Sequence, residues 1–127
     1  MQQATAPALE SGTADLRPLD VTVMRKAARR LLAEDAELPS DGELDTLMLQ
    51  LRGHAMLAIP VVEALAARLA EDDVPRACAL VGVGEARTRL GLEPRHALPA
   101  RIADAQRLAR SVNALCDHYE NLCQARP

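Results

Sequence analysis

The sequence contains two long stretches in which apolar residues recur at alternating spacings of three and four positions. Such spacing places every member on the same side of an α-helix, and it is typical of long helices that pack side by side through a continuous seam. The first stretch consists of Leu44, Leu47, Met48, Leu51, Ala55, Ala58, Val62, Leu65 and Leu69, and the second of Leu98, Ile102, Ala105, Ala109, Val112, Cys116, Tyr119 and Cys123. We therefore predict two long helices joined by one apolar seam.

Capping residues mark where the first two helices begin. Asp20 is a suitable N-cap for a short amphipathic helix that extends to about Asp35. Ser40 and Glu43 form a capping-box sequence, in which each side chain accepts a hydrogen bond from the backbone N–H of the other residue. The second helix is therefore predicted over about residues 42–70.

Pro60 falls inside this second helix. A proline removes one backbone hydrogen bond and collides with the carbonyl four residues earlier, so we expect a kink between Met56 and Pro60. Because the apolar seam keeps its phase across the proline, one kinked helix is preferred to two separate helices.

Two further helices are predicted in the C-terminal half. Acidic residues 71–73 precede a Val-Pro pair, which is a favourable start for a third helix over residues 74–91. A Leu-Pro pair opens a fourth helix over about residues 98–124, and the short joints indicate antiparallel neighbours.

These elements define the expected fold. Residues 20–127 are predicted to form one all-α domain, an antiparallel bundle of about four helices of which two are long and one is kinked at Pro60. Residues 1–19 are rich in small and polar residues, so we predict a disordered leader there.

The composition narrows the classes of function. The chain is 49% hydrophobic with a net charge of −3, but it has no Trp, no Phe and one Tyr. It therefore offers no aromatic platforms for stacking bases and no aromatic cage for a cation.

No apolar run is long enough to cross a membrane, and residues 1–19 lack the apolar segment of a signal peptide. A cytoplasmic protein whose three cysteines stay reduced is expected.

A small set of residues is the candidate for a ligand-binding site. The two glycines of the third helix allow the close approach of a neighbouring helix or of a ligand, and packing of a helix is the simpler interpretation. Histidine and glutamate side chains would supply the polar groups of the site. The six candidates are His54, Glu63, Gly82, Gly84, Glu85 and His118.

No catalytic residue, metal site or cofactor is predicted. Cys116 and His118 differ by two positions and point to different sides of a helix, and the Gly-Val-Gly sequence of the third helix follows no strand. Two interpretations of the acidic candidates stay open. One is a buried pair with Arg87 between helices, and the other is a surface pair of Glu85 with Arg89, four residues on.

A compact basic patch lies on the first helix and consists of Arg25, Lys26, Arg29 and Arg30. A basic helix can lie on DNA phosphates. However, acidic residues follow closely over 34–37, and no helix-turn-helix with a polar recognition helix is apparent. Nucleic acid is therefore not the favoured partner.

Four segments carry a resemblance to a known family. They are LRGH at residues 51–54, DDVPRACAL at 72–80, GEAR at 84–87 and ARSVNALCDHYE at 109–120. Together they resemble an uncharacterised family of small actinobacterial proteins, a domain of unknown function labelled as natural-product biosynthesis proteins, over about residues 42–122. The resemblance implies a role beside secondary-metabolite biosynthesis and assigns no site residue.

Three hypotheses of function follow. The leading one is a non-catalytic accessory or regulatory protein of secondary-metabolite biosynthesis that acts by contact with a protein partner or a second copy, because four long helices carry more apolar seam than one thin bundle buries. The alternative is a small-molecule binding or catalytic bundle that uses the six candidates. The third is a DNA-binding regulator that uses the basic patch of the first helix.

Overall fold

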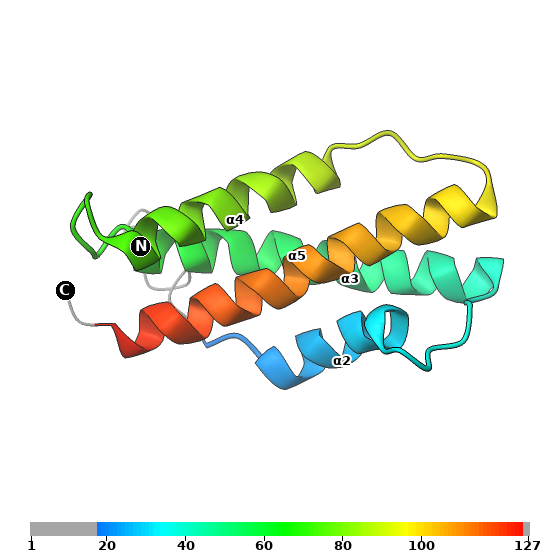
Figure 1. Ribbon diagram of the computed structural model, residues 1–127, viewed down its shortest axis with the longest axis horizontal. Helices are drawn as coiled ribbons and strands as arrows, with labels where there is room; N and C mark the ends of the chain where they lie inside the picture. Colours follow the sequence, from blue (N-terminus) through cyan, green and yellow to red (C-terminus); the bar gives the residue numbers. More distant parts are fainter. Residues whose placement is uncertain (1–17, 126–127) are drawn as a thin grey trace, which may run out of the picture.

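The computed structural model describes residues 18–125, which form four α-helices (Figure 1). The described part of the chain contains no strand, so the predicted all-α bundle of four helices is confirmed. The helices are α2 (Val21–Leu32), α3 (Asp41–Ala66), α4 (Val74–Leu90) and α5 (Leu98–Gln124).

Two long parallel helices, α3 and α5, form the centre of the bundle (Figure 1). The other two run in the opposite direction on either side of this pair: α2 packs mainly on α5, and α4 packs on both central helices. Within the described residues α2 and α4 do not contact each other. The bundle is therefore flattened. Each central helix has an outer side that α2 and α4 do not cover.

Three of the four helices begin at a side-chain cap, namely Asp20 for α2, Ser40 for α3 and Asp73 for α4. The side chain of Asp20 accepts a hydrogen bond from the N–H of Val23, and that of Ser40 accepts one from the N–H of Glu43, both at 3.2 Å. The other half of the predicted capping box is not formed, because the carboxylate of Glu43 instead binds the guanidinium of Arg30 on α2. A charged partner on a second helix thus replaces a backbone N–H.

The helix α3 continues through Pro60 as one element. The preference for one helix over two is therefore confirmed. The helix ends at Ala66, four residues before the predicted end, and Leu69 beyond it is still buried. The apolar seam thus extends past the helix into the α3–α4 joint.

The predicted seam is the core of the molecule. Its members Leu51, Ala55 and Val62 on α3 are buried, as are Ala105 and Val112 on α5. Cys123, the last predicted member, is exposed instead, because Leu122 supplies the buried side chain at that end. The buried hydrophobic side chains of this interior are aliphatic or sulfur-containing, and Ser111 is a buried polar residue beside them.

The predicted leader lies outside the described residues except for Pro18 and Leu19. Leu19 is buried, and its backbone N–H donates a hydrogen bond to the hydroxyl of Tyr119 on α5 at 3.2 Å. The chain is therefore anchored to α5 just before α2 begins. Among the helices of residues 18–125, none combines the length and the apolarity needed to cross a membrane.

Candidate functional site

Two of the six predicted ligand residues meet across the α4–α5 contact. A Cβ atom placed on Gly82 would lie 2.8 Å from both Cδ2 and Nε2 of His118. Contact distances below 3.0 Å are not found for real Cβ atoms, so the glycine makes room for the imidazole. The close approach that the sequence predicted at Gly82 is thus filled by a side chain of this chain.

The two candidates on α3, His54 and Glu63, lie on different sides of that helix. His54 and Glu63 are nine positions apart, which is half a turn around the helix. His54 is half-buried on the side of Asp20, and burial lowers its pKa while the nearby Asp20 carboxylate opposes the shift. Glu63 points to α4, where its carboxylate lies 2.8 Å from the guanidinium of Arg87. The two side chains therefore do not converge on one site.

The structure realises neither of the two interpretations of the acidic candidates as predicted, although Glu63 does pair with Arg87. This pair joins α3 to α4, but both side chains are more than one third exposed, so it is a surface pair and not a buried anchor. The guanidinium of Arg89 binds the carbonyl oxygen of Arg107 and the hydroxyl of Ser111 on α5. The surface pair of Glu85 with Arg89 is therefore not formed.

The last two candidates face solvent. Glu85 and Gly84 are exposed, and a Cβ on Gly84 would meet no atom within 4 Å. The structure thus unites Gly82 with His118 and leaves the other four candidates apart. Ligand binding by these residues stays a prediction.

The basic patch on α2 is partly neutralised. The guanidinium of Arg25 lies 2.7 Å from Asp117 and 2.8 Å from Glu120 on α5, and that of Arg30 lies 2.7 Å from Glu43. These ion pairs fix α2 to both central helices and reduce the positive charge that a phosphate backbone would meet.

Within residues 18–125, no cluster of three or more histidine, cysteine or carboxylate side chains is arranged to hold a metal ion.

The first candidate surface is the solvent side of α3, which we call the outer α3 face. All six exposed residues between positions 46 and 58 of this helix are uncharged: Thr46, Leu49, Gln50, Gly53, Met56 and Leu57. Leu49, Met56 and Leu57 are 73%, 60% and 52% exposed. Over this segment α3 presents three large apolar side chains and no charge to solvent, in addition to its apolar seam toward the core. Apolar side chains on two opposite sides are typical of a helix that is covered on both.

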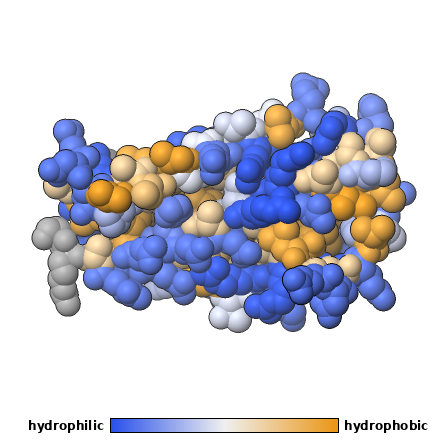
Figure 2. All heavy atoms as spheres, in the orientation of Figure 1, coloured by the Kyte–Doolittle hydropathy of each residue, from blue (hydrophilic) through white to orange (hydrophobic). Residues whose placement is uncertain are grey.

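The equivalent side of α5 has the opposite character. Its exposed residues between positions 107 and 120 are all charged: Arg107, Arg110, Asp117 and Glu120. Figure 2 shows hydrophilic residues along this face of the molecule. Since α3 and α5 hold equivalent places in the bundle, the lack of charge on the outer α3 face is a property of that helix and not of the architecture.

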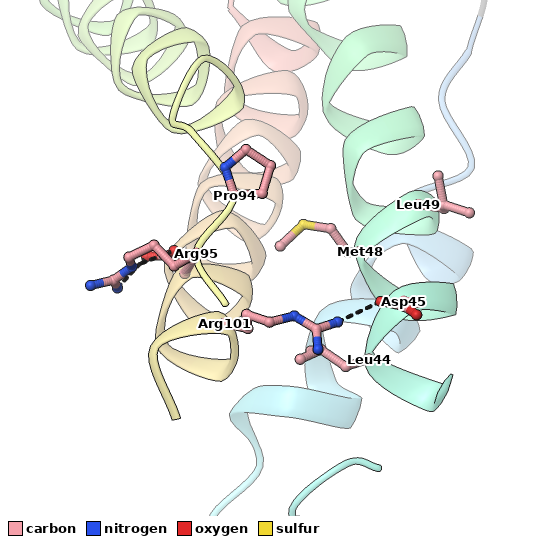
Figure 3. Close-up of a pocket in the computed structure, with 8 residues that line it drawn as sticks. Leu44, Asp45, Met48, Leu49, Pro94, Arg95 and Arg101 are labelled. Carbon is pink, nitrogen blue, oxygen red and sulfur yellow. Dashed lines mark hydrogen bonds and ion pairs between the residues drawn. The ribbon is translucent and has the colours of Figure 1, made fainter. Parts of the chain in front are cut away.

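The second candidate is a cavity of about 380 Å³ at the end of the bundle where the α4–α5 loop lies, which we call the loop-end groove (Figure 3). Residues of α3, of the loop and of α5 line it: Leu44, Asp45, Met48, Leu49, Pro94, Arg95, Arg101 and Asp104. Met48 and Pro94 face each other from α3 and from the loop (Figure 3). A neighbouring cavity of about 250 Å³ shares Met48, Pro94 and Asp104.

Two sets of ion pairs hold the rim of the groove. The guanidinium of Arg95 binds both carboxylate oxygens of Asp104, at 2.9 and 2.7 Å, and Arg101 binds Asp41 and Asp45 at the start of α3. The hydrogen bonds from Arg95 lower the pKa of Asp104, helped by the charges of Arg95 and Arg107, against the opposing effect of burial. The loop and both central helices are therefore tied together at the mouth of the groove.

Sequence reasoning singled out neither of these two surfaces. The outer α3 face has a readable signal, because Leu49, Gly53, Met56 and Pro60 follow one another at spacings of four, three and four, on the side opposite the seam. The groove has no comparable signal. Its lining comes from three separate segments that only the folded chain brings together.

The fold and these surfaces define a small all-α protein, a flattened four-helix bundle with an uncharged outer face on α3 and a groove at its loop end. Residues 22–124 match the model of DUF6415, a family of unknown function, and the chain belongs to this family. The comparisons with curated proteins and with solved structures gave no match.

Proposed function

We propose that the protein is a non-catalytic helical accessory or regulatory protein that acts by protein–protein contact through the outer α3 face. The observation that carries this proposal is the run of six exposed, uncharged residues on a central helix. Full burial of one Leu or Met side chain stabilises a complex by about 1.5–3 kcal/mol, so three such residues on one face favour a partner.

Gly53 supports the same face. A glycine inside a helix costs about 1 kcal/mol relative to alanine. A Cβ at this position would meet no atom within 4 Å, so no contact inside the molecule requires a glycine there. The open space beside Gly53 leaves room for a second helix to approach α3 closely.

A second copy of the chain is the partner that the pattern of residues fits. In an antiparallel pair of α3 helices related by a two-fold axis, the large residues near the start of one helix lie opposite the end of the other. Leu49 then lies opposite the small side chains of Ala64 and Ala67, and Met56 lies opposite Pro60. Large side chains at Leu49 and Met56 thus meet smaller ones in the other copy, while Leu57 lies close to the two-fold axis.

The charges beside the face fit the same arrangement. Arg52 and Glu63 are eleven positions apart, close to three full turns, and both lie on the α4 side of α3, where Arg52 binds the carbonyl oxygen of Leu90 and Glu63 binds Arg87. In the antiparallel pair, Arg52 of each copy lies opposite Glu63 of the other. Opposite charges therefore flank the apolar contact at both ends.

The size of the contact sets its strength. A standard interface buries about 800 Å² on each partner, and a contact through one helix is smaller. We therefore expect a dimer that dissociates at micromolar concentrations. The resemblance to a family labelled as natural-product biosynthesis proteins supports secondary metabolism as the setting in which such a dimer would act as an accessory or regulator.

Sedimentation velocity of the full chain from micromolar to millimolar concentration tests the proposal. We expect a concentration-dependent dimer that Met56→Glu converts to a monomer. Val81→Glu is the matched control, because Val81 is an equally apolar residue, 65% exposed, on α4. A monomer at every concentration, or equal loss of the dimer in both variants, would overturn the proposed contact.

A further inference from the structure

A second feature of the molecule, the loop-end groove, which shares Leu49 with the outer α3 face, carries an inference beyond protein contact. We propose that this groove is a binding site for a small, neutral, mostly hydrocarbon molecule. The groove lies between α3, the α4–α5 loop and α5. Its volume of about 380 Å³ falls within the range of small-molecule sites.

The inner surface of the groove is apolar. Leu44 is buried at its base, Met48 is half-buried, and Leu49 and Pro94 complete the walls. An unbranched methionine adapts its shape to different ligands more readily than a β-branched residue does. The walls therefore favour burial of a hydrocarbon group and accept ligands of different shapes.

The charges at the rim select against a charged ligand. All four charged residues that line the groove are already in ion pairs, Arg95 with Asp104 and Arg101 with Asp45. The lining thus carries equal numbers of positive and negative side chains, and each has its partner. An anion would have to displace a carboxylate from an arginine, and a cation would lose its hydration without gaining a free carboxylate. A neutral molecule avoids both costs.

The groove is also held open before a ligand arrives. The guanidinium of Arg95 binds Asp104 through two hydrogen bonds and the carbonyl oxygen of Ala100 through a third, at 3.2 Å. These contacts fix the α4–α5 loop, so Pro94 stays across the groove from Met48 (Figure 3). A preformed mouth lowers the ordering cost that a ligand must overcome.

A matched pair of fluorescent probes tests the proposal on the full chain. N-phenyl-1-naphthylamine is neutral, and 8-anilinonaphthalene-1-sulfonate carries the same rings with a sulfonate group. We expect saturable one-to-one binding of the neutral probe and binding of the anionic probe that is weaker by about tenfold or more. Equal or tighter binding of the anion would overturn the charge argument.

Variants locate the probe. Met48→Trp fills the groove and Leu49→Asp places a charge at its mouth, and each should weaken binding of the neutral probe by about tenfold or more. Because Leu49 is 73% exposed, Leu49→Asp leaves the fold intact even if Met48→Trp does not. Met56→Glu on the outer α3 face should leave binding unchanged. Absence of saturable binding, indifference to Leu49→Asp, or loss of binding in Met56→Glu would each contradict the groove as the site.

Discussion

The imidazole of His118 on α5 occupies the space that a side chain at Gly82 on α4 would need. A Cβ at residue 82 would lie 2.8 Å from Nε2 of His118, whereas a Cβ at Gly84 would meet no atom within 4 Å. Two glycines in one helix therefore have different physical settings. Gly82 permits a contact between helices, and Gly84 faces solvent.

This difference gives the first prediction. Gly84→Ala should raise the free energy of unfolding by about 0.5–1 kcal/mol, because alanine favours the helix and nothing obstructs its methyl group. Gly82→Ala should destabilise the protein, since the imidazole must move. Denaturant unfolding measures both variants. In the His118→Ala background Gly82→Ala should become stabilising, and an unchanged penalty there would show that the ring is not the obstacle.

The second prediction concerns the three thiols. Cys116 is fully buried, and burial raises the pKa of its thiol to about 11, while Cys78 and Cys123 are exposed. Because the thiolate is the reactive form, native protein should show two thiols that react quickly with Ellman's reagent and one that reacts only on unfolding. Cys116→Ala should remove the slow thiol alone. Three equally fast thiols would show that Cys116 is open to solvent.

The third prediction concerns His54 and pH. Burial lowers the pKa of His54 below its ordinary value of 6.5, so the unfolded chain binds a proton at a higher pH than the folded chain does. The stability that depends on neutral His54 is complete above pH 6.5 and is lost as the pH falls through that value toward the folded pKa. His54→Gln should therefore flatten the fall in melting temperature between about pH 7.5 and pH 5. His96→Gln, in the exposed loop, is the control and should leave the slope unchanged.

The fourth prediction concerns the ion pair of Arg95 with Asp104 at the rim of the loop-end groove. The hydrogen bonds from Arg95 lower the folded pKa of Asp104 below its ordinary value of 3.8. The pair stabilises the fold at neutral pH, and this contribution is lost as the pH falls below 3.8 through the folded pKa. Asp104→Asn should lower the melting temperature at pH 7, and the difference from the parent should shrink at acid pH. Glu34→Gln, on an exposed residue, should show no such pattern.

The helices and the core were predictable because their signals are local. Asp20 and Ser40 cap backbone N–H groups three residues away, and the seam of α3 and α5 follows the helical period. The predicted hydrogen bond from the Ser40 N–H to Glu43 was wrong because the carboxylate binds Arg30, which comes from another helix. The spacing of residues within one segment does not reveal a partner from a second segment.

The candidate site was less predictable for the same reason. The small side chain at Gly82 indicated a close neighbour, but the identity of His118 depends on the register between α4 and α5. The pairing of Glu63 with Arg87 likewise depends on how α3 and α4 pack. At the loop-end groove, Arg95 ties the α4–α5 loop to Asp104 on α5, and the spacing of residues along the chain does not report this tertiary contact.

The most direct test of the proposed dimer is a charge swap at Arg52 and Glu63, which are predicted to pair between two copies of α3. Sedimentation equilibrium would be compared for the parent, Arg52→Glu, Glu63→Arg and the double variant. Each single change places like charges opposite each other in an antiparallel dimer, and the double change restores opposite charges. We predict that both single variants weaken the dimer and that the double variant recovers it. Equal weakening in the double variant, or no dimer in the parent, would contradict contact through the outer α3 face.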